Sequence, residues 1–347
     1  MLIRILKGLL YTTVVLLVLL AAALGYLFQH QEIITEKVER WYESNYTGDL
    51  QLGKLSLSSW RQWPEITLRI QHISLTDNSQ KLAVPTLLID TLAADLSLAN
   101  IFQREITLEK ITLQGGYLHG LTLANGDANT SILQALHPTP PDQRKESFFR
   151  LRYDQGLAVA ITDFDLVRVN ELKNKRIAGF IRQMTAEVTL SDTLIIANTV
   201  FDACVEGLGF NLDKGSFLED TPANGHLNLH FDRQRSTIEI PQFPLQLKDQ
   251  VFLTEACLDV GQEGVFFLSL FNNQTDFQAT KGLLTKYLQN KLARFQIFEL
   301  IATATSLQGE IRADDNPLVY VDFTAADNTV LIDQEVRFTK VKGSGSF

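Results

Sequence analysis

The segment that decides the fold class is Ile66-Thr67-Leu68-Arg69-Ile70-Gln71-His72-Ile73-Ser74-Leu75. Its apolar residues occupy every second position as far as Ile70, and an alternation of period two is typical of a β-strand with one apolar face. Two polar residues then separate Ile70 from Ile73, so the alternation changes phase. An extra residue at that point predicts a β-bulge that bends the strand.

The part of this segment from Leu68 to Leu75, with its change of phase, returns 38 residues later in Ile106-Thr107-Leu108-Glu109-Lys110-Ile111-Thr112-Leu113. A repeat of about 20–50 residues is typical of stacked arrays, although a β-rich sequence also produces such matches by chance. Apolar residues alternate in the same way at other positions nearby, namely Leu92, Ala94, Leu96, Leu98, Leu121 and Leu123.

More strands are predicted along the rest of the chain, at 156–169, 179–190, 194–213, 225–240, 243–260 and 265–270, and again from Gln308 to beyond 335–339. One helix interrupts them at about 280–295, where Leu284, Leu288 and Leu292 fall on one stripe. Hairpin turns are predicted at four places, which are Asp77-Asn78, Asn125-Gly126, Asp213-Lys214-Gly215 and Asn224-Gly225.

The first thirty residues predict a membrane anchor. Arg4 and Lys7 precede an apolar run over 8–28, and ~20 such residues span the hydrocarbon core of a bilayer. Because basic residues stay on the cytoplasmic side, the rest of the chain is expected in the periplasm, on the far side of an inner membrane. A cleaved signal peptide is the alternative, but the run exceeds the ~7–15 residues of a signal core.

Four regions are expected beyond the anchor at 1–30. Residues 31–46 predict an amphipathic stalk helix, with Ile34, Val38 and Trp41 on its apolar stripe. The Pro-rich stretch 137–147 predicts a linker between a first β-repeat region at 47–136 and a continued β region at 148–347. The final Gly-Ser-rich residues follow a strand pattern without a cap, so we interpret the sequence as the N-terminal portion of a longer protein; an added tail is the alternative.

Composition excludes several classes of function. Of the 347 residues, 31 are basic and 40 acidic, giving a formal charge of −9, whereas a nucleic-acid-binding protein needs a basic surface. Hydrophobic residues make up 45%, which argues against a disordered chain. Two cysteines and six histidines leave little material for a zinc or iron–sulfur site. We therefore expect no cofactor and no metal.

The residues that could carry chemistry favour structural interpretations. His226 and His230 lie in an alternating stretch, and four strand steps separate them by ~13 Å, too far for one metal ion. Asp163 and Asp165 would lie ~7 Å apart on one strand face, a spacing compatible with paired carboxylates but lacking a partner base. Gly207 and Gly209 precede no predicted helix, so they do not form a nucleotide loop.

Cys204 and Cys257 are compatible with a disulfide outside the cytoplasm, provided that their strands are neighbours. Two reduced, packed thiols are the alternative, and the one we favour, since cysteine is frequently buried without a bridge.

An ordered set of weak motifs resembles the AsmA-like family, including its Bacteroidota-type members, over residues 1–133. The residues that carry the resemblance are the short anchor, 47–58, Trp60, Trp63-Pro64, Ile66 to Leu68, Ile89-Asp90, Leu92 to Leu98, Ile106 to Leu113 and 126–129. A weaker resemblance continues at 276–284 and 317–319. Members of this family extend further than this sequence does.

The resemblance implies a fold: an N-terminal transmembrane helix followed by an elongated, twisted antiparallel β-sheet groove with a few short helices. It also implies a role in phospholipid or other acyl-chain lipid movement between inner and outer membranes and in envelope biogenesis, without catalytic residues. The residues expected to line the groove are Ile66, Leu68, Ile70, Leu92, Leu96, Leu98, Ile106, Leu108, Leu121 and Leu123.

Three functions compete at this point. The first is a lipid-holding or lipid-conducting scaffold on the inner membrane. The second is a non-catalytic scaffold for outer-membrane protein assembly, with a closed β-sandwich core and an outer-membrane or periplasmic protein partner. The third is a membrane-tethered hydrolase that uses Asp163 and Asp165. Alternation alone does not distinguish a lipid-lined groove from an ordinary core, because both need one apolar sheet face.

Overall fold

The computed structural model describes residues 31–45, 48–58, 65–77, 84–100, 103, 105–129, 150–152, 156–259, 264–310, 317–333 and 335–346. These residues form one large twisted sheet with a few short helices, which confirms the predicted mainly β class. The predicted anchor at 1–30 and the predicted linker at 137–147 lie outside the described residues.

The sheet has 17 strands. In the first half they are β1 (Gly48–Leu52), β2 (Leu55–Ser58), β3 (Glu65–Asp77), β4 (Leu87–Ser97), β5 (Glu105–Thr122), β6 (Arg150–Arg152), β7 (Leu157–Asn170), β8 (Lys175–Leu190) and β9 (Leu194–Gly209). In the second half they are β10 (Thr221–Asp232), β11 (Thr237–Leu247), β12 (Gln250–Asp259), β13 (Val265–Thr275), β14 (Phe295–Ile297), β15 (Ile301–Glu310), β16 (Leu318–Ile332) and β17 (Val336–Ser346).

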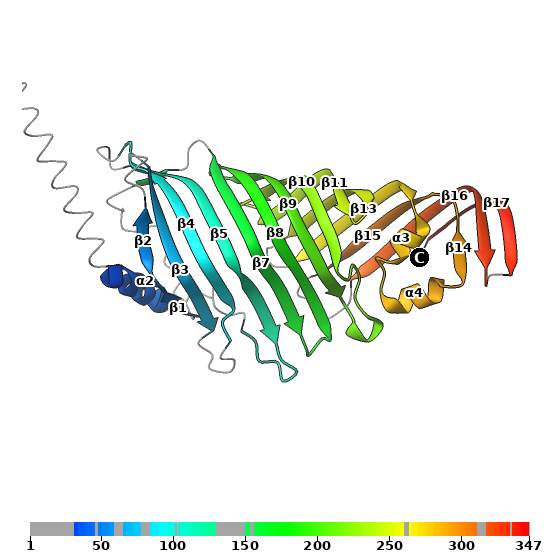
Figure 1. The fold of residues 1–347 in the computed structure, drawn as a ribbon, viewed down its shortest axis with the longest axis horizontal. Helices are drawn as coiled ribbons and strands as arrows, with labels where there is room; N and C mark the ends of the chain where they lie inside the picture. The colour runs from blue at the N-terminus through cyan, green and yellow to red at the C-terminus, as the bar shows by residue number, and fades with distance from the viewer. Residues whose placement is uncertain are drawn as a thin grey trace, which may run out of the picture.

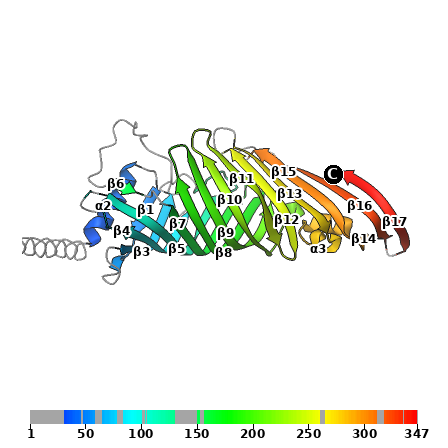
Figure 2. The same ribbon diagram turned by 90° about the horizontal axis from the view of Figure 1, so that it is seen from above.

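Neighbouring strands follow the order of the chain almost throughout, so the sheet extends in one direction from β3 to β17. β1 and β2 both pair with β3, and the short β14 pairs with β16. The result is an elongated sheet whose strands change their slant between β3–β9 and β11–β16 as the sheet twists (Figures 1 and 2).

The sheet is mixed, so the expectation of a wholly antiparallel sheet is wrong at one place. β5 runs parallel to both β6 and β7, whereas the other strand pairs among the described residues are antiparallel. The physical reason lies in the connection: residues 123–156 separate β5 from β7, and a parallel neighbour requires a long crossover in place of a tight hairpin.

The predicted β-bulge in β5 is confirmed, whereas the one in β3 is wrong. In β3, His72 adopts a left-handed φ of 57° and drops out of the ladder between the pairs Gln71–Thr91 and Ile73–Ile89, but the register with β4 is the same on both sides, so the strand bends without an extra residue relative to its neighbour. In β5, Glu109 is the extra residue between the pairs Leu96–Leu108 and Asp95–Lys110.

The strands next to β3 bend at the same level as His72. On each of them one residue beside His72 is left out of the strand pairing, namely Asp90 of β4, Gly115 of β5, Asp163 of β7 and Arg182 of β8. Gly115 and Asp163 also have left-handed φ values, of 69° and 53°. We call these five residues the bend row. On either side of it, residues of the same sheet face are three apart in sequence instead of two, as at Ile70 and Ile73.

Two segments that were each predicted as one strand span parts of two strands in the structure. The segments 225–240 and 243–260 are interrupted by the turns that join β10 to β11 and β11 to β12, the second of which uses Lys248 with a φ of 51°. The predicted turn at Asn224-Gly225 is wrong, because both residues lie within β10. Gly225 is needed there for packing: an added Cβ would lie 3.2 Å from ring carbons of both Phe201 and Phe243.

The predicted helix at 280–295 consists of two short helices, α3 (Phe277–Lys281) and α4 (Lys286–Leu292). Gly282 ends α3, and the Thr285 hydroxyl accepts a hydrogen bond of 3.3 Å from the Leu288 N–H to cap α4. Between the two helices the side chain of Leu283 is 7% exposed. The chain breaks the helix to place this leucine in the core.

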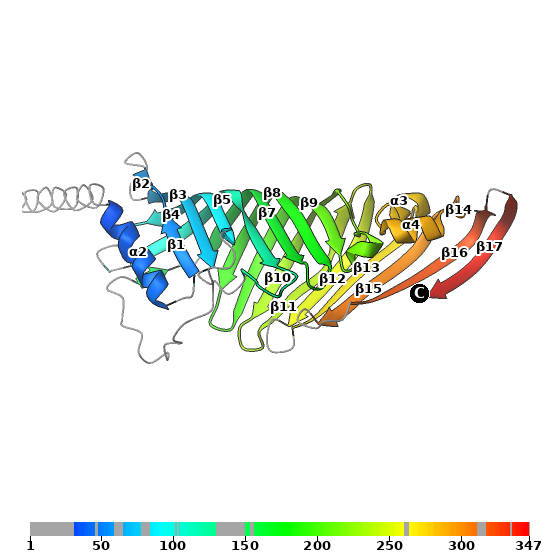
Figure 3. The ribbon, with the colours of Figure 1, turned by 90° about the horizontal axis from the view of Figure 1, so that it is seen from below.

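The helix predicted at 31–46 is present as α2 (Gln31–Asn45). Its predicted packing stripe is wrong, since Trp41 is 58% exposed and Val38 is also exposed. Tyr42 is the buried residue instead, and it packs on Leu75 of β3. Glu39 adds a hydrogen bond of 2.6 Å from the Leu52 N–H, so α2 lies against the edge of the sheet at β1 (Figure 3).

Candidate functional site

One face of the sheet carries two unbroken rows of apolar residues. Residues that are paired directly across neighbouring strands share a face, so the register identifies each row. The first row contains Leu55, Ile70, Leu92, Leu113, Ile161, Met184, Phe201, Gly225, Leu245 and Phe252, one from each strand from β2 to β12 except β6. We call this side of the sheet the apolar face.

The second row lies on the other side of the bend row. It contains Leu52, Ile73, Ile89, Gly116, Phe164, Ile181, Ala203, Ala223 and Leu247. Adjacent strands are ~4.8 Å apart. The first row crosses nine strands from β3 to β12 and the second crosses nine from β1 to β11, so each is about 40 Å long. No polar side chain interrupts either row.

The bend row explains how the two rows meet. Ile73, Ile89 and Phe164 are buried in one cluster, together with partly buried neighbours from both rows such as Ile70 and Leu92. Because the strands bend here, side chains from both sides of the bend come into contact on the apolar face. Among the described residues, the side chains packed on this cluster all come from strands of the same sheet.

Helical segments cover the apolar face only near its ends within the part of the chain that the structure describes. Tyr42 of α2 covers Leu75 at one end. At the other end Leu283, between α3 and α4, packs on Ala223, Leu247 and Phe252. Figure 3 shows these helices near the two ends of the sheet.

Most of the groove residues predicted from the sequence lie on this face. Ile66, Leu68, Ile70, Leu92 and Leu96 are paired with other apolar residues there and are half-buried, as are Ile106 and Leu108. Leu98, directly after β4, is 5% exposed. All of these side chains except Leu98 keep part of their surface accessible.

Leu121 lies near the end of β5 and differs from the rest in its orientation, and Leu123 follows directly after the strand. Leu121 lies an even number of residues from Tyr117 and His119, so it is on the same face as these two residues, opposite to the face that carries Leu118. The rings of Tyr117 and His119 stack there at a centroid distance of 4.0 Å. Asn129, 1% exposed, fixes this end: its amide oxygen accepts a hydrogen bond of 2.7 Å from the Leu121 N–H.

Several apolar-face residues were not singled out from the sequence, namely Leu113, Ile161, Met184, Phe201, Leu245 and Phe252. Their alternation is visible in the sequence. Their membership of one continuous row depends on the strand register, which alternation alone does not fix.

Four side chains on the sheet surface have pKa values shifted by neighbouring groups. The Arg182 guanidinium bonds the Asp202 carboxylate at 2.6 Å, which lowers the pKa of Asp202 and raises that of Arg182. The N–H groups of Arg235 and Gln234, in the turn after β10, lower the pKa of Asp232 at the end of that strand. Backbone N–H donation from Thr329 lowers the pKa of Glu299. The three carboxylates lie on separate elements: Asp202 in β9, Asp232 at the end of β10 and Glu299 between β14 and β15.

The candidate chemical residues occupy strand positions. His226 and His230 both lie on β10, as expected, and the His226 imidazole bonds the Asn198 side chain. Asp163 belongs to the bend row, so the regular spacing assumed between it and Asp165 does not apply. The described residues contain no group of three or more His, Cys, Asp or Glu side chains arranged to hold a metal ion.

Cys204 on β9 and Cys257 on β12 are separated in the sheet by β10 and β11. Both thiols are half-buried and free. The expectation of two reduced, packed cysteines is confirmed.

Within the described ranges, no helix is both long and apolar enough to cross a membrane. The chain matches none of the protein-family models, and a search of the curated proteins finds no match either.

Proposed function

We propose that this chain is an inner-membrane-anchored periplasmic protein of the AsmA-like type, which holds or conducts acyl-chain lipids along the apolar face of its sheet. Its role would be non-catalytic and would serve lipid transfer between inner and outer membranes in envelope biogenesis. The observation that carries this proposal is the first apolar row, which runs from β2 to β12 and whose members between β3 and β11 are only partly buried, with the mostly buried second row beside it.

The length of the rows fits a lipid path better than a single binding site. A bilayer core of ~30 Å holds two leaflets, so one acyl chain extends over ~15 Å. The rows are about 40 Å long, more than twice that length. A lipid chain could therefore remain on an apolar surface while it moves by more than its own length.

The energetic role of such a face is to offset the cost of leaving the bilayer. Exposing a CH₂ group to water costs ~0.8 kcal/mol, so an acyl chain that crosses an aqueous space alone meets a prohibitive barrier. An apolar strip removes much of that barrier without requiring tight binding.

Photocrosslinking tests the proposal. A photoreactive residue at Leu68, Leu96 or Leu108 should capture phospholipid in cells, and the same probe at Arg69 on the opposite face should not. Capture of protein side chains alone at all three apolar positions would count against a lipid path.

A protein-assembly scaffold is the second candidate, and a specific observation favours it. The opposite face between β12 and β16 carries exposed apolar side chains, which are Val251, Leu253, Val265, Phe267, Phe271, Leu318 and Tyr320. Exposed apolar patches commonly mark protein contacts. Isolation of a stable outer-membrane or periplasmic protein partner, without co-purifying lipid, would favour this function.

A further inference from the structure

The face of the sheet opposite the apolar face carries an apolar patch of its own between β12 and β16. Strand register places its exposed side chains beside one another, and we call them the outer patch: Val251, Leu253, Phe267, Phe271, Leu318 and Tyr320. Phe267 and Phe271 are 36% and 40% exposed although β13 is an inner strand of the sheet. Both rings are therefore accessible in the part of the chain that the structure describes.

The charged side chains on this face around the outer patch are acidic. Glu255 of β12, Glu310 of β15 and Asp322 of β16 lie on the same face as the patch and are exposed. β11, β12, β13, β15 and β16 contain no lysine or arginine. Within the described ranges these three carboxylates form no ion pair. The outer patch therefore combines apolar side chains with negative charge that the strands themselves do not neutralise.

Glu255 lies between two aromatic rings. It pairs with Ser269 of β13, so Phe267 and Phe271 occupy the two diagonal positions on the neighbouring strand, ~7–8 Å away. A guanidinium or ammonium group that binds the Glu255 carboxylate can therefore also lie on the face of a phenylalanine ring. Both interactions attract a cation, and an anionic ligand would gain neither.

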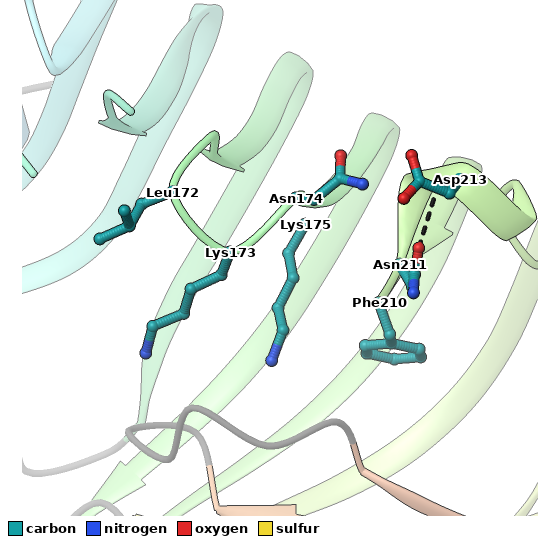
Figure 4. A pocket seen from close by; sticks show the side chains of 7 residues that line it. All are labelled: Leu172, Lys173, Asn174, Lys175, Phe210, Asn211 and Asp213. Atoms are coloured by element: carbon teal, nitrogen blue, oxygen red, sulfur yellow. Dashed lines mark hydrogen bonds between the residues drawn. The ribbon is translucent and has the colours of Figure 1, made fainter. Parts of the chain in front are cut away.

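A cavity of about 380 Å³ opens at one end of the outer patch. Its lining includes Val251, Leu253, Phe271 and Asp249. This combination suits an apolar side chain that has a basic residue next to it. The cavity between the β7–β8 turn and the loop after β9 differs, because Lys173 and Lys175 are among its lining residues (Figure 4). A cationic ligand would be repelled there and attracted to the outer patch.

The size of the outer patch suits one segment of polypeptide. Its four strands extend over ~14 Å, and the six residue steps from Val251 to Cys257 cover ~20 Å, so the patch occupies about 300 Å². A stable contact between two folded proteins buries ~800 Å² on each partner. A symmetric contact between two copies of this chain would also place carboxylates opposite carboxylates, which repel.

We propose that the outer patch binds a basic amphipathic segment of a protein partner. A lysine or arginine of the segment would bind Glu255 between the two rings, and an apolar side chain would enter the cavity beside Phe271. A helix of about 13 residues would span the ~20 Å of the patch. This inference rests on the second candidate function, the protein scaffold, and gives its partner a defined chemistry. It does not depend on the lipid path, which lies on the opposite face.

The test measures binding of fluorescent peptides to the full chain in phosphatidylcholine nanodiscs by fluorescence anisotropy. The first probe is an amphipathic helical peptide of about 13 residues built from leucine and lysine, and the second has glutamate in place of each lysine. Empty nanodiscs give the background due to lipid. We expect the lysine peptide to bind the chain at least about tenfold more tightly than the glutamate peptide.

Two double variants remove the two components of the outer patch. Glu255→Gln/Asp322→Asn removes two carboxylates and should lower the affinity for the lysine peptide by about threefold to tenfold, as expected for two exposed ion pairs. Phe267→Thr/Phe271→Thr removes the rings but keeps residues that favour a strand, and it should lower this affinity by about tenfold. If either variant melts at a lower temperature, the single substitutions Glu255→Gln and Phe267→Thr replace it.

The chain offers a matched control for each variant. Glu187→Gln/Asp192→Asn removes the same charge from exposed positions in β8 and the turn after it. Phe298→Thr/Phe338→Thr removes two exposed rings outside the patch. Both controls should leave the affinity for the lysine peptide within about twofold, because the removed groups lie more than a Debye length of ~10 Å from the patch. Equal losses in the patch and control variants would show non-specific attraction and overturn the proposal.

The remaining outcomes separate this site from the lipid function. Unchanged affinity for the lysine peptide in both patch variants overturns the docking site. So does self-association of the unmodified chain that Phe267→Thr/Phe271→Thr abolishes, if the peptide does not bind. Lipid capture at Leu108 without peptide binding refutes the docking site alone. Peptide binding that the patch variants weaken, without lipid capture at Leu108, supports the docking site and refutes the lipid function alone.

Discussion

Replacing Leu108 with aspartate distinguishes an open apolar face from a closed core. Leu108 lies in β5, pairs directly with Leu96 of β4 and is half-buried. A carboxylate at this position would stand among apolar side chains on the proposed lipid path. We expect Leu108→Asp to block lipid transfer while leaving the fold largely intact.

The magnitude follows from the partial burial. Full burial of a leucine side chain contributes ~1.5–3 kcal/mol, so about half of that, ~1 kcal/mol, is lost, and the carboxylate keeps much of its hydration. A loss of ~1 kcal/mol lowers Tm by ~2–4 °C in a domain of about 150–250 residues. In a closed core, an unpaired buried charge would instead cost ~3–5 kcal/mol and lower Tm by about 10 °C or more.

The assay pairs thermal melting with lipid transfer from donor to acceptor vesicles. Thr107→Asp is the matched control, because it places the same charge one residue away, on the opposite face of the same strand, where Thr107 pairs with Ser97. The control should melt close to the unmodified protein and transfer lipid normally. A Tm lowered by about 10 °C or more in Leu108→Asp, or transfer that persists in this variant, would refute the reasoning.

Three further predictions concern the sheet itself. Phe164→Ala should lower the free energy of unfolding by ~3–5 kcal/mol in urea titrations, because this ring is 6% exposed and belongs to the buried cluster with Ile73 and Ile89. A loss below ~1 kcal/mol would show that the cluster is not a core. Gly225→Ala should cost ~1–3 kcal/mol, since its methyl group would press on two phenylalanine rings at 3.2 Å, and an unchanged urea midpoint would contradict the packing. Arg182→Ala should remove the interaction that lowers the pKa of Asp202 from 3.8. The stability that the lowered pKa provides is present above pH ~3.8 and is lost as pH falls through the folded-state pKa. The free energies of unfolding of the two proteins should therefore differ at neutral pH and converge in acid.

The strand pattern was largely predictable because local alternation reports which residues share a face. The bends after Ile70 and Leu108 could be predicted as well, since an extra polar residue changes the phase within a single strand. The break between the two helices at 282–285 was not predicted, because the apolar stripe of Leu284, Leu288 and Leu292 indicates one continuous helix. Burial of Leu283 outweighed the local helical periodicity.

The continuity of the apolar face could not be predicted, because it is a property of register. Met184 and Phe201 are unremarkable in sequence, and they become members of a row only when β8 and β9 pair as they do.

The bend row also restricts how this sequence can change over time. Deletion of His72 alone would move every later side chain of β3 to the opposite face of the sheet, while the side chains of the neighbouring strands kept their original faces. A shorter or longer bend is tolerable only if adjoining strands gain or lose their extra residue together. Homologous sequences should therefore show coordinated single-residue insertions and deletions in these strands, a correlated record that alignments of any relatives can reveal.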